Sequence, residues 1–260
     1  MSFVTWREGL TRVVQALAAG LDIHTDSPVE RIERTDDGRY RLRVGASAAA
    51  GDADERTFDA VVVALPGDRA AALLDGLAPR APGLLGQTPR ANVATLVLAY
   101  PRHVVEALPA FAGTGILVPS SVDSLLKAAT FLSTKWPHLD HPDLYFCRAS
   151  AGRAGDERLA GLDDDALVAR VRADLARFIG LQAAPRHVHV QRWPAALPQL
   201  TVGHLDRLSA ARDDLPAGLT LAGSSYDGVG IAACLGSARR AATDVLTHLG
   251  PTHAQGGTRA

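Results

Sequence analysis

The chain has 260 residues, and 47% of them are hydrophobic, which is enough to build one large domain or two modest ones. Its 27 Lys and Arg residues nearly balance its 28 Asp and Glu residues, so the sequence lacks the basic excess that nucleic acids or anionic membranes favour. No stretch has the roughly 18 consecutive apolar residues of a membrane helix, and the first residues carry no signal-peptide pattern. We therefore expect a cytoplasmic protein with no transmembrane segment and no nucleic-acid partner.

The first part of the chain predicts an α/β start. Apolar residues at helical spacing over Arg7–Leu21 predict a helix that Gly20 ends. Short strands are expected next in LDIHTD, PVERIERTDDG and RYRLRVG, and the last two form a hairpin around Asp36–Gly38. The unbroken apolar run Ala60–Leu65 is typical of a strand buried on both faces.

The middle of the chain predicts a second, more antiparallel sheet. A short helix is expected over 68–77, and strands are expected over 92–101, 113–120, 125–133, 143–150 and 187–193. Apolar residues at helical spacing predict a helix over 162–180, with acidic residues near its positive N-terminal end. A proline-containing loop over 193–204 then precedes a final strand and helix. This order predicts a mixed α/β (α+β) fold of two domains, one of them discontinuous in sequence.

The final strand and helix enclose a glycine-rich loop. The apolar strand 219–222 is followed by Gly223, Gly228 and Gly230, and a helix rich in small residues runs from Val229 to Leu249. Ligands of open α/β sheets bind at the carboxyl ends of strands, where a helix N-terminus offers free N–H groups to negative charge. Glycines there let a flat ligand approach the backbone. The spacing is not GxGxxG, so a tight structural turn remains an equally good interpretation of the glycines alone.

Other chemistry is poorly supported by the sequence. His187 and His189 share one face of a strand without a third ligand, and the loop carrying His138, Asp140 and His141 fits a solvated loop better than a metal site, so no metal is expected. Cys147 and Cys234 have no metal-binding spacing, and we expect reduced thiols. Serine pairs lack GxSxG context, and no general base stands out, so the catalytic residues remain unknown.

The C-terminal glycine-rich segment and seven further segments, in order, resemble one family. They are the Gly9-Leu10 helix start, SPVERIE, VVVALP, GILVPS, KAATFLSTKW with CRASAGRAGDE, RWPAALPQLTVGH, and LAGSSYDGVGIAACLGSARRAA. The chain resembles the coproporphyrinogen and protoporphyrinogen oxidases of the amine-oxidase-like FAD superfamily from about Phe3 to Leu249. The resemblance implies a two-domain FAD oxidase that converts a porphyrinogen to a porphyrin in haem biosynthesis, with oxygen as the electron acceptor.

The resemblance also implies site residues. By this likeness Val29 contacts the adenine through its backbone, and Trp193 lies beside the FAD. The remaining cofactor positions belong to the glycine-rich loop and are Gly223, Gly228, Val229, Gly230 and Ile231. A porphyrinogen carries propionates that need cations, for which Lys127 and Arg148, and less so Arg153, are candidates.

The chain departs from the family because it carries no strand, GxGxxG loop and helix for the FAD pyrophosphate, the N-terminal Rossmann βαβ unit. We expect either a fragment or a partner polypeptide that supplies this segment. The expected domains are a partial FAD-binding domain (1–68 and 202–250), a substrate-binding domain (69–201) and a disordered tail (251–260). The alternatives are an inactive fragment or porphyrin-binding remnant and, less favoured, another amine-oxidase-like flavoenzyme.

Overall fold

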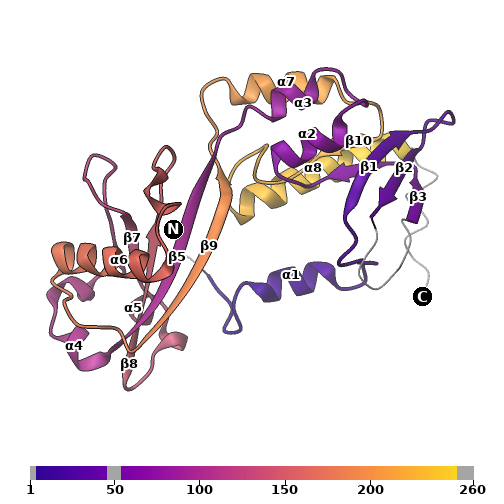
Figure 1. The fold of residues 1–260 in the computed structure, drawn as a ribbon. Helices are drawn as coiled ribbons and strands as arrows, with labels where there is room; N and C mark the ends of the chain where they lie inside the picture. Colours follow the sequence, from indigo (N-terminus) through magenta and orange to yellow (C-terminus); the bar gives the residue numbers. More distant parts are fainter. Residues whose placement is uncertain (1–3, 46–53, 251–260) are drawn as a thin grey trace. The chain divides into compact units, whose positions relative to one another are not determined.

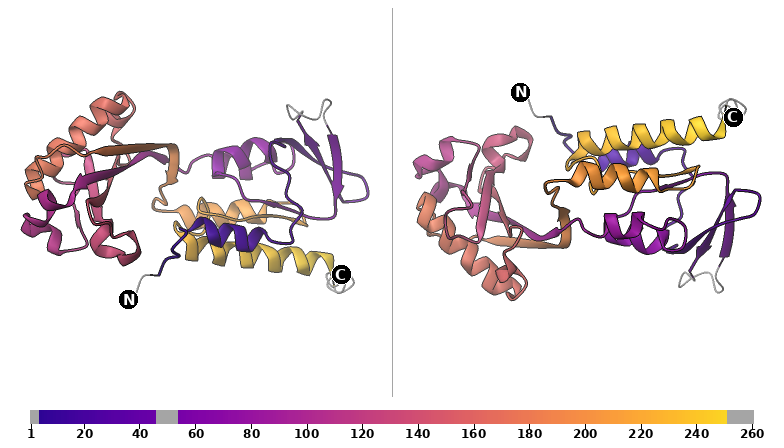
Figure 2. Two further views of the ribbon diagram at one scale, coloured as in Figure 1. Left: turned by 90° about the horizontal axis from the view of Figure 1, so that it is seen from below. Right: turned by 90° about the horizontal axis from the view of Figure 1, so that it is seen from above.

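The computed structural model describes residues 4–45 and 54–250, which divide into two compact units (Figures 1 and 2). Unit 1 combines Met1–Pro89 with Leu200–Ala260, and unit 2 is Arg90–Gln199. The mixed α/β fold agrees with the sequence. Segment 69–89, which was expected in the substrate-binding domain, lies in unit 1. The predicted disordered tail, 251–260, falls outside the described residues.

Helix α1 (Thr11–Ala18) is the predicted N-terminal helix of unit 1, but none of its residues is buried. The side chains of Leu10, Val14 and Leu17, which form its apolar stripe, are 49%, 66% and 57% exposed. The prediction of a strand at LDIHTD is wrong. Residues 21–26 form no strand, because none of the described strands pairs with them.

A three-stranded antiparallel sheet follows in the order β1, β2, β3, with bounds Val29–Arg34, Tyr40–Val44 and Asp54–Phe58. The predicted hairpin between β1 and β2 is confirmed. In its turn, the N–H of Thr35 donates to the carbonyl of Arg39 at 2.9 Å, and Gly38 has a φ of +84°, which other residues rarely adopt. Both figures show this sheet at one end of the unit.

A two-stranded parallel sheet forms the centre of unit 1. Strands β4 (Val61–Val63) and β10 (Leu219–Leu221) pair in parallel, as the sequence predicts for β10. All three residues of β10 are buried, whereas Val62 and Leu65 are 43% and 42% exposed. The expected burial of Ala60–Leu65 on both faces is therefore wrong, because one face of β4 is left uncovered by the described part of the chain.

Four helices pack around this sheet: α2 (Gly67–Leu74), α3 (Ala81–Leu85), α7 (His204–Asp213) and α8 (Ile231–Leu249). The sequence predicts α2 and α8 but not α3 and α7. The carboxylate of Asp214, just after α7, accepts the N–H groups of Arg80 and Ala81 at 2.7 and 2.8 Å and so caps α3. Desolvation opposes the ionisation of Asp214, but these hydrogen bonds outweigh it and hold its pKa below the usual value.

Unit 2 is built on a five-stranded antiparallel sheet in the order β6, β7, β8, β5, β9, which confirms the predicted antiparallel sheet. The bounds are Gly115–Leu117, Leu126–Phe131, Leu144–Ala151, Arg90–Pro101 and His187–Pro198 in that order. Strand β9 continues through 194–198, where a loop was expected. It does so past a bulge at which the N–H of Ala195 donates to the side chain of Asn92 at 2.8 Å.

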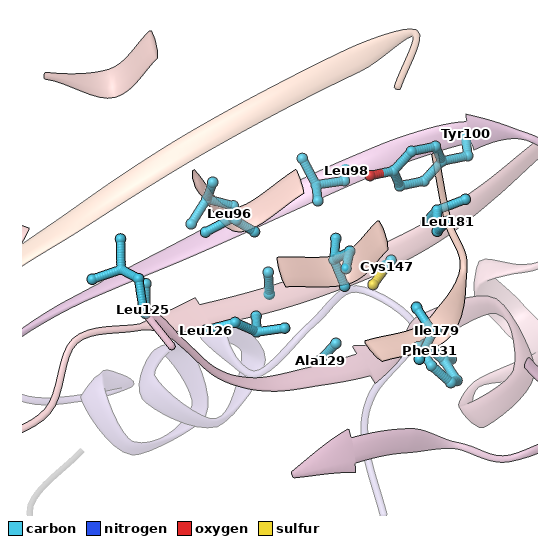
Figure 3. Close-up of a cluster of buried hydrophobic side chains, with 14 of the residues drawn as sticks. Leu96, Leu98, Tyr100, Leu125, Leu126, Ala129, Phe131, Cys147, Ile179 and Leu181 are labelled. Atoms are coloured by element: carbon cyan, nitrogen blue, oxygen red, sulfur yellow. The ribbon is translucent and has the colours of Figure 1, made fainter. Parts of the chain in front are cut away.

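Helix α6 (Asp164–Ile179) contributes to the core of unit 2. It begins where the side chain of Asp163 accepts the N–H of Ala166 at 2.8 Å, and it ends at Gly180, which has a φ of +72°. Buried side chains of the strands and the helix form one cluster (Figure 3), which includes Leu96, Leu98, Tyr100, Leu126, Phe131, Cys147, Leu167, Val171 and Leu175. The sheet therefore has one covered face.

Shorter helices, α4 (Arg102–Glu106) and α5 (Leu132–Lys135), complete unit 2 together with three 3₁₀ turns at Pro109–Ala112, Pro137–Leu139 and Glu157–Leu159. The two cysteines lie in different units, and both are free. Burial raises the pKa of the Cys147 thiol to about 12.

Neighbouring residues of β5 provide a test of this packing. Leu98 is fully buried, whereas Val97 is half-buried and points to the other face. We expect Leu98→Ala to lower the free energy of unfolding by about 2–5 kcal/mol because it leaves a cavity. Val97→Ala should cost less than about 1.5 kcal/mol, since little packing is lost. Urea unfolding followed by circular dichroism measures both, and equal losses would contradict the assignment of the two faces.

Candidate functional site: a glycine loop and an open sheet face

The glycine-rich loop 223–230 joins the carboxyl end of β10 to the start of α8. Gly223, Gly228 and Gly230 have φ values of +121°, +133° and +109°, so each needs a residue without a Cβ. A Cβ at Gly228 would lie 3.2 Å from that of Ala233, whereas one at Gly230 would meet nothing within 4 Å. The backbone conformation therefore explains why glycine occupies these three positions, and open space lies beside Gly230.

The N-terminus of α8 is free to receive a ligand. Its N-cap residue, Gly230, supplies no side-chain hydrogen bond, and the first-turn N–H groups of an α-helix have no acceptor within the helix. Val229 and Ile231 on either side are 49% and 52% exposed. The 19-residue helix thus directs free donors and the positive end of its dipole at solvent, which suits an atom that carries or develops negative charge.

Two hydrogen bonds hold the loop against the rest of unit 1. Tyr226 is 1% exposed, and its hydroxyl donates to the carbonyl of Leu65, just beyond β4, at 2.6 Å. The carbonyl of Tyr226 in turn accepts from Nε2 of His204, a buried residue at the start of α7, at 2.7 Å. Burial raises the pKa of the Tyr226 hydroxyl, so it remains a donor at physiological pH.

An apolar groove of about 700 Å³ adjoins the loop. Side chains of α1 and α8 line it together with Gly230, among them Val13, Val14, Leu17, Ile231, Cys234 and Leu235. The free end of α8 therefore opens beside an apolar surface, and a flat ring with one polar edge fits both features.

The second candidate surface is the open face of the sheet in unit 2. Directly paired residues of antiparallel strands project to the same side. Arg148 on β8 pairs with Thr130 on β7 and with Val97 on β5, and Val97 pairs with His189 on β9. Arg148 is exposed, so a cation stands near the middle of the face opposite the core.

Trp193 lies on the same open face. Its partner Val93 stands two residues before Thr95 on β5, and the indole Nε1 of Trp193 donates to Oγ1 of Thr95 at 3.4 Å. The side chain of Trp193 is 48% exposed, so part of its ring is available for contact with a ligand.

The other residues suggested by the sequence are placed as follows. Val29 is half-buried at the start of β1, and Lys127 is half-buried at a bulge in β7. Arg153 donates to the carbonyl of Val118 at 2.6 Å and so supports a loop. The structure thus brings the five loop residues together in unit 1 and places Arg148 and Trp193 on one face in unit 2.

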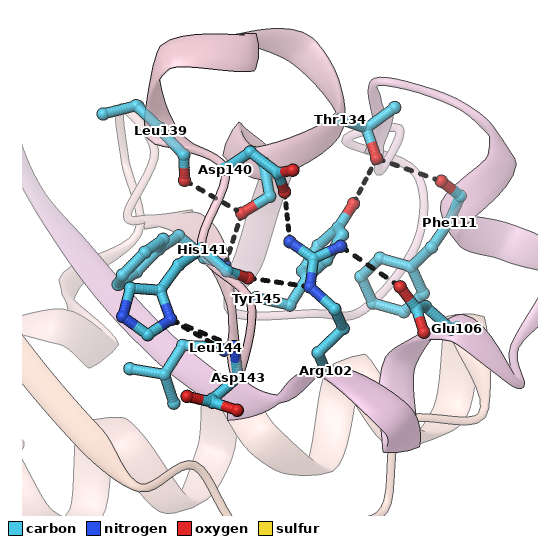
Figure 4. Close-up of polar contacts among 12 residues, drawn as sticks. Arg102, Glu106, Phe111, Thr134, Leu139, Asp140, His141, Asp143, Leu144 and Tyr145 are labelled. Carbon is cyan, nitrogen blue, oxygen red and sulfur yellow. Dashed lines mark hydrogen bonds and ion pairs between the residues drawn. The ribbon is translucent and has the colours of Figure 1, made fainter.

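Hydrogen bonds and an ion pair within the protein explain the conformation of the loop that carries His138, Asp140 and His141. Asp140 pairs with Arg102, which also donates to the carbonyl of His141 at 2.8 Å (Figure 4). The N–H groups of Asp143 and Leu144 donate to Nδ1 of His141 at 3.1 and 3.2 Å. Among residues 4–45 and 54–250, no three His, Cys, Asp or Glu side chains gather as a metal would require.

Sequence patterns did not identify His204, His189 or Thr95 as site residues. The alternation of HVHVQRW did signal that His187 and His189 share a face, but it did not show which face is open. No sequence pattern pointed to His204, because its role depends on a hydrogen bond to the carbonyl of Tyr226, 22 positions away.

A sequence model of the family described as flavin containing amine oxidoreductase matches residues 1–246. The chain belongs to this family. The coproporphyrinogen III oxidase of Mycobacterium tuberculosis (strain ATCC 25618 / H37Rv) is 39% identical over 191 residues, which are 74% of this chain and 41% of the relative. The protoporphyrinogen oxidase of Homo sapiens is 29% identical over 253 residues, which are 92% of this chain and 51% of the relative.

Structure comparison agrees. A crystal structure from Exiguobacterium sp. 255-15, designated a protoporphyrinogen oxidase, matches with a TM-score of 0.80 and 30% identity over 94% of this chain and 52% of that one. The resemblance to porphyrinogen oxidases and the amine-oxidase type of fold are confirmed. The chain spans about half the length of the curated relatives it matches. The flavin in the family description supports FAD as the cofactor. No described helix of this family member meets the length and apolarity that crossing a bilayer requires.

Two buried tyrosines test the anchoring of the loop. Tyr226→Phe leaves the carbonyl of Leu65 without its donor, and we expect a loss of about 1–2 kcal/mol in the free energy of unfolding. Tyr100→Phe is the matched control, because the buried hydroxyl of Tyr100 has no partner among the described residues. Its removal should be neutral or stabilising. Thermal and urea unfolding measure both, and a greater loss from Tyr100→Phe would contradict this account.

Proposed function

We propose that the chain forms the flavin-ring side and the substrate surface of an FAD-dependent oxidase that converts a porphyrinogen to a porphyrin in haem biosynthesis, with oxygen as electron acceptor. The observation that carries the proposal is the glycine loop 223–230, which runs into the uncapped N-terminus of α8. Membership of the flavin-containing family and the names of the relatives support it.

The loop residues fit a flavin ring. Gly230 leaves space where a flat ring can approach, and the free N–H groups at the start of α8 suit the edge of the ring that becomes negative on reduction. FAD supplies the redox chemistry by accepting two electrons as hydride. The protein would bind the ring, orient it and stabilise its developing charge through these donors. Val29 and Trp193 are proposed as further FAD contacts by resemblance.

The open sheet face fits the substrate class. Coproporphyrinogen and protoporphyrinogen both carry carboxylates on a large apolar ring, and the face offers the exposed Arg148 beside Val97 and the partly exposed ring of Trp193. His189 lies two strands from Arg148, about 10 Å away at the usual strand spacing. Lys127 is a further candidate for a carboxylate contact. The two substrates share this chemistry, and the proposal covers both.

The pyrophosphate of FAD needs a GxGxxG segment, which the resemblance predicts to come from another polypeptide or from the rest of a longer chain. Two observations on unit 1 support such a complement. Val62, on one face of β4, is 43% exposed, and none of the residues of α1 is buried. Parallel sheets are normally covered on both faces, so unit 1 offers an apolar surface that a further α/β segment fits. We propose that the oxidase and its complement act in the cytoplasm.

A glycine variant tests the flavin assignment. We expect FAD to bind the purified chain saturably, and we expect the FAD fluorescence to be quenched and shifted when it binds. Gly230→Val should weaken this binding by roughly tenfold or more, because a β-branched residue is strained at a φ of +109°. Gly236→Ala within α8, where a Cβ meets nothing within 4 Å, should bind like the parent. If the parent chain shows no saturable FAD binding even with the segment that supplies GxGxxG present, the proposal is contradicted and an inactive, porphyrin-binding remnant is favoured.

An arginine variant tests the substrate surface. We expect Arg148→Ala to weaken coproporphyrin III binding by roughly 10- to 100-fold, the effect of losing a charged hydrogen bond. Arg148→Lys should retain much of the affinity because the charge remains. Arg170→Ala, at an exposed position on α6, is the control and should bind like the parent. Fluorescence titration at one salt concentration measures all four proteins, and equal affinities would exclude Arg148 from the site.

A further inference from the structure

The carboxylate of Asp227 is the most heavily contacted group of the glycine loop. Arg212 on α7 donates to both of its oxygens, at 3.0 and 2.9 Å, and Arg240 on α8 forms an ion pair with it. The hydroxyl of Ser237 on α8 donates to the same carboxylate at 2.5 Å. The Asp227 side chain is 14% exposed, so these bonds are largely shielded from water. Asp227 therefore joins the loop to two helices at once.

Ser237 extends the connection to the start of the loop. It is 1% exposed, and its oxygen accepts the N–H of Gly223 at 2.9 Å while its proton points to Asp227. One buried hydroxyl thus ties the first residue of the loop to the fifth. Because Ser237 belongs to α8, the loop is fixed to the same helix whose N-terminus it leads into.

The charges keep this arrangement intact at neutral pH. Burial raises the pKa of Asp227, but the hydrogen bonds from Ser237 and Arg212 and the charges of Arg212 and Arg240 outweigh it and leave the pKa below its ordinary value. Two arginines face one carboxylate, so loss of its charge would leave two cations close together without their anion. The ionised carboxylate is needed to hold the loop.

Asp227 is also the last residue of the loop whose side chain is bonded to other side chains. The free N–H donors at the start of α8 follow it. Gly228 and Gly230 have no side chains, and Val229 is 49% exposed. The orientation of the backbone at 228–231 is therefore set by the bonds that end at Asp227 on one side and by α8 on the other.

We propose that Asp227, through Arg212, Arg240 and Ser237, is a positioning residue that directs the free N–H groups at the start of α8 toward the edge of the bound flavin ring. The inference rests on the proposed function for the flavin. It extends that function because it assigns the redox preference of the site to a residue that acts through the backbone it holds.

The test compares Asp227→Asn with Asp244→Asn. Asp244 is an exposed residue on α8 that accepts one hydroxyl hydrogen bond, from Thr220, at 3.3 Å. In the flavin-loaded proteins we expect Asp227→Asn to shift the visible spectrum of FAD and to reduce the preference for reduced over oxidised flavin about tenfold. That change lowers the two-electron midpoint potential by about 30 mV. Asp244→Asn should leave both unchanged, and Asp227→Glu should restore part of the shift.

A second measurement separates this inference from the flavin assignment. In the flavin-free chain, Asp227→Asn should speed amide hydrogen exchange at 228–231 about tenfold, whereas Asp244→Asn should not. Unchanged exchange overturns the positioning role whether or not flavin binds. Faster exchange with an unchanged potential and spectrum in a flavin-loaded variant also overturns it. A parent chain that binds no FAD even with the segment that supplies GxGxxG present overturns the proposed function instead, and unchanged exchange still overturns the positioning role independently.

Discussion

The hydrogen bond from the Tyr226 hydroxyl to the carbonyl of Leu65 is the constraint on which the candidate flavin site depends. Strands β4 and β10 are parallel, so their carboxyl ends meet at one edge, and this bond ties the segment that leaves β10 to the residue just beyond β4. His204 holds the same residue from the opposite direction through its carbonyl. With Tyr226 fixed at both ends, the chain turns sharply through glycines and enters α8 with no cap at its N-terminus.

The two units offer different chemistry. The loop in unit 1 presents backbone donors, which only a substitution to proline removes directly, and its side chains serve to hold the backbone in place. The open sheet face of unit 2 presents side chains, Arg148 and Trp193 among them, on strands whose other face is fixed by a packed core. A cofactor of constant structure suits the first kind of surface, and a substrate that must be distinguished from others suits the second.

Local patterns in the sequence predicted the elements whose burial follows a clear period. The helix α6 carries an apolar stripe, an aspartate cap and a terminal glycine, and the hairpin at Gly38 carries its own turn residue, so both were found. Helix α7 was missed because its sequence, HLDRLSAARD, is mostly polar, and it is held by contacts with α3. The glycine loop was located from its residues, but its anchors His204 and Arg212 lie at a distance in sequence that no local pattern encodes. The open face of the sheet was not predictable either, since alternation marks two faces without showing which one the core covers.

Under the proposed function, the exposed stripe of α1 and the exposed Val62 link the folding of unit 1 to the segment proposed to cover them. A partner that binds only the folded state adds stability in proportion to the logarithm of its concentration relative to its dissociation constant. The apparent melting temperature of unit 1 is then a property of the mixture rather than of the polypeptide alone. Under the proposal that a separate polypeptide completes unit 1, comparisons of variants in this unit are made at one fixed concentration of that polypeptide, including zero.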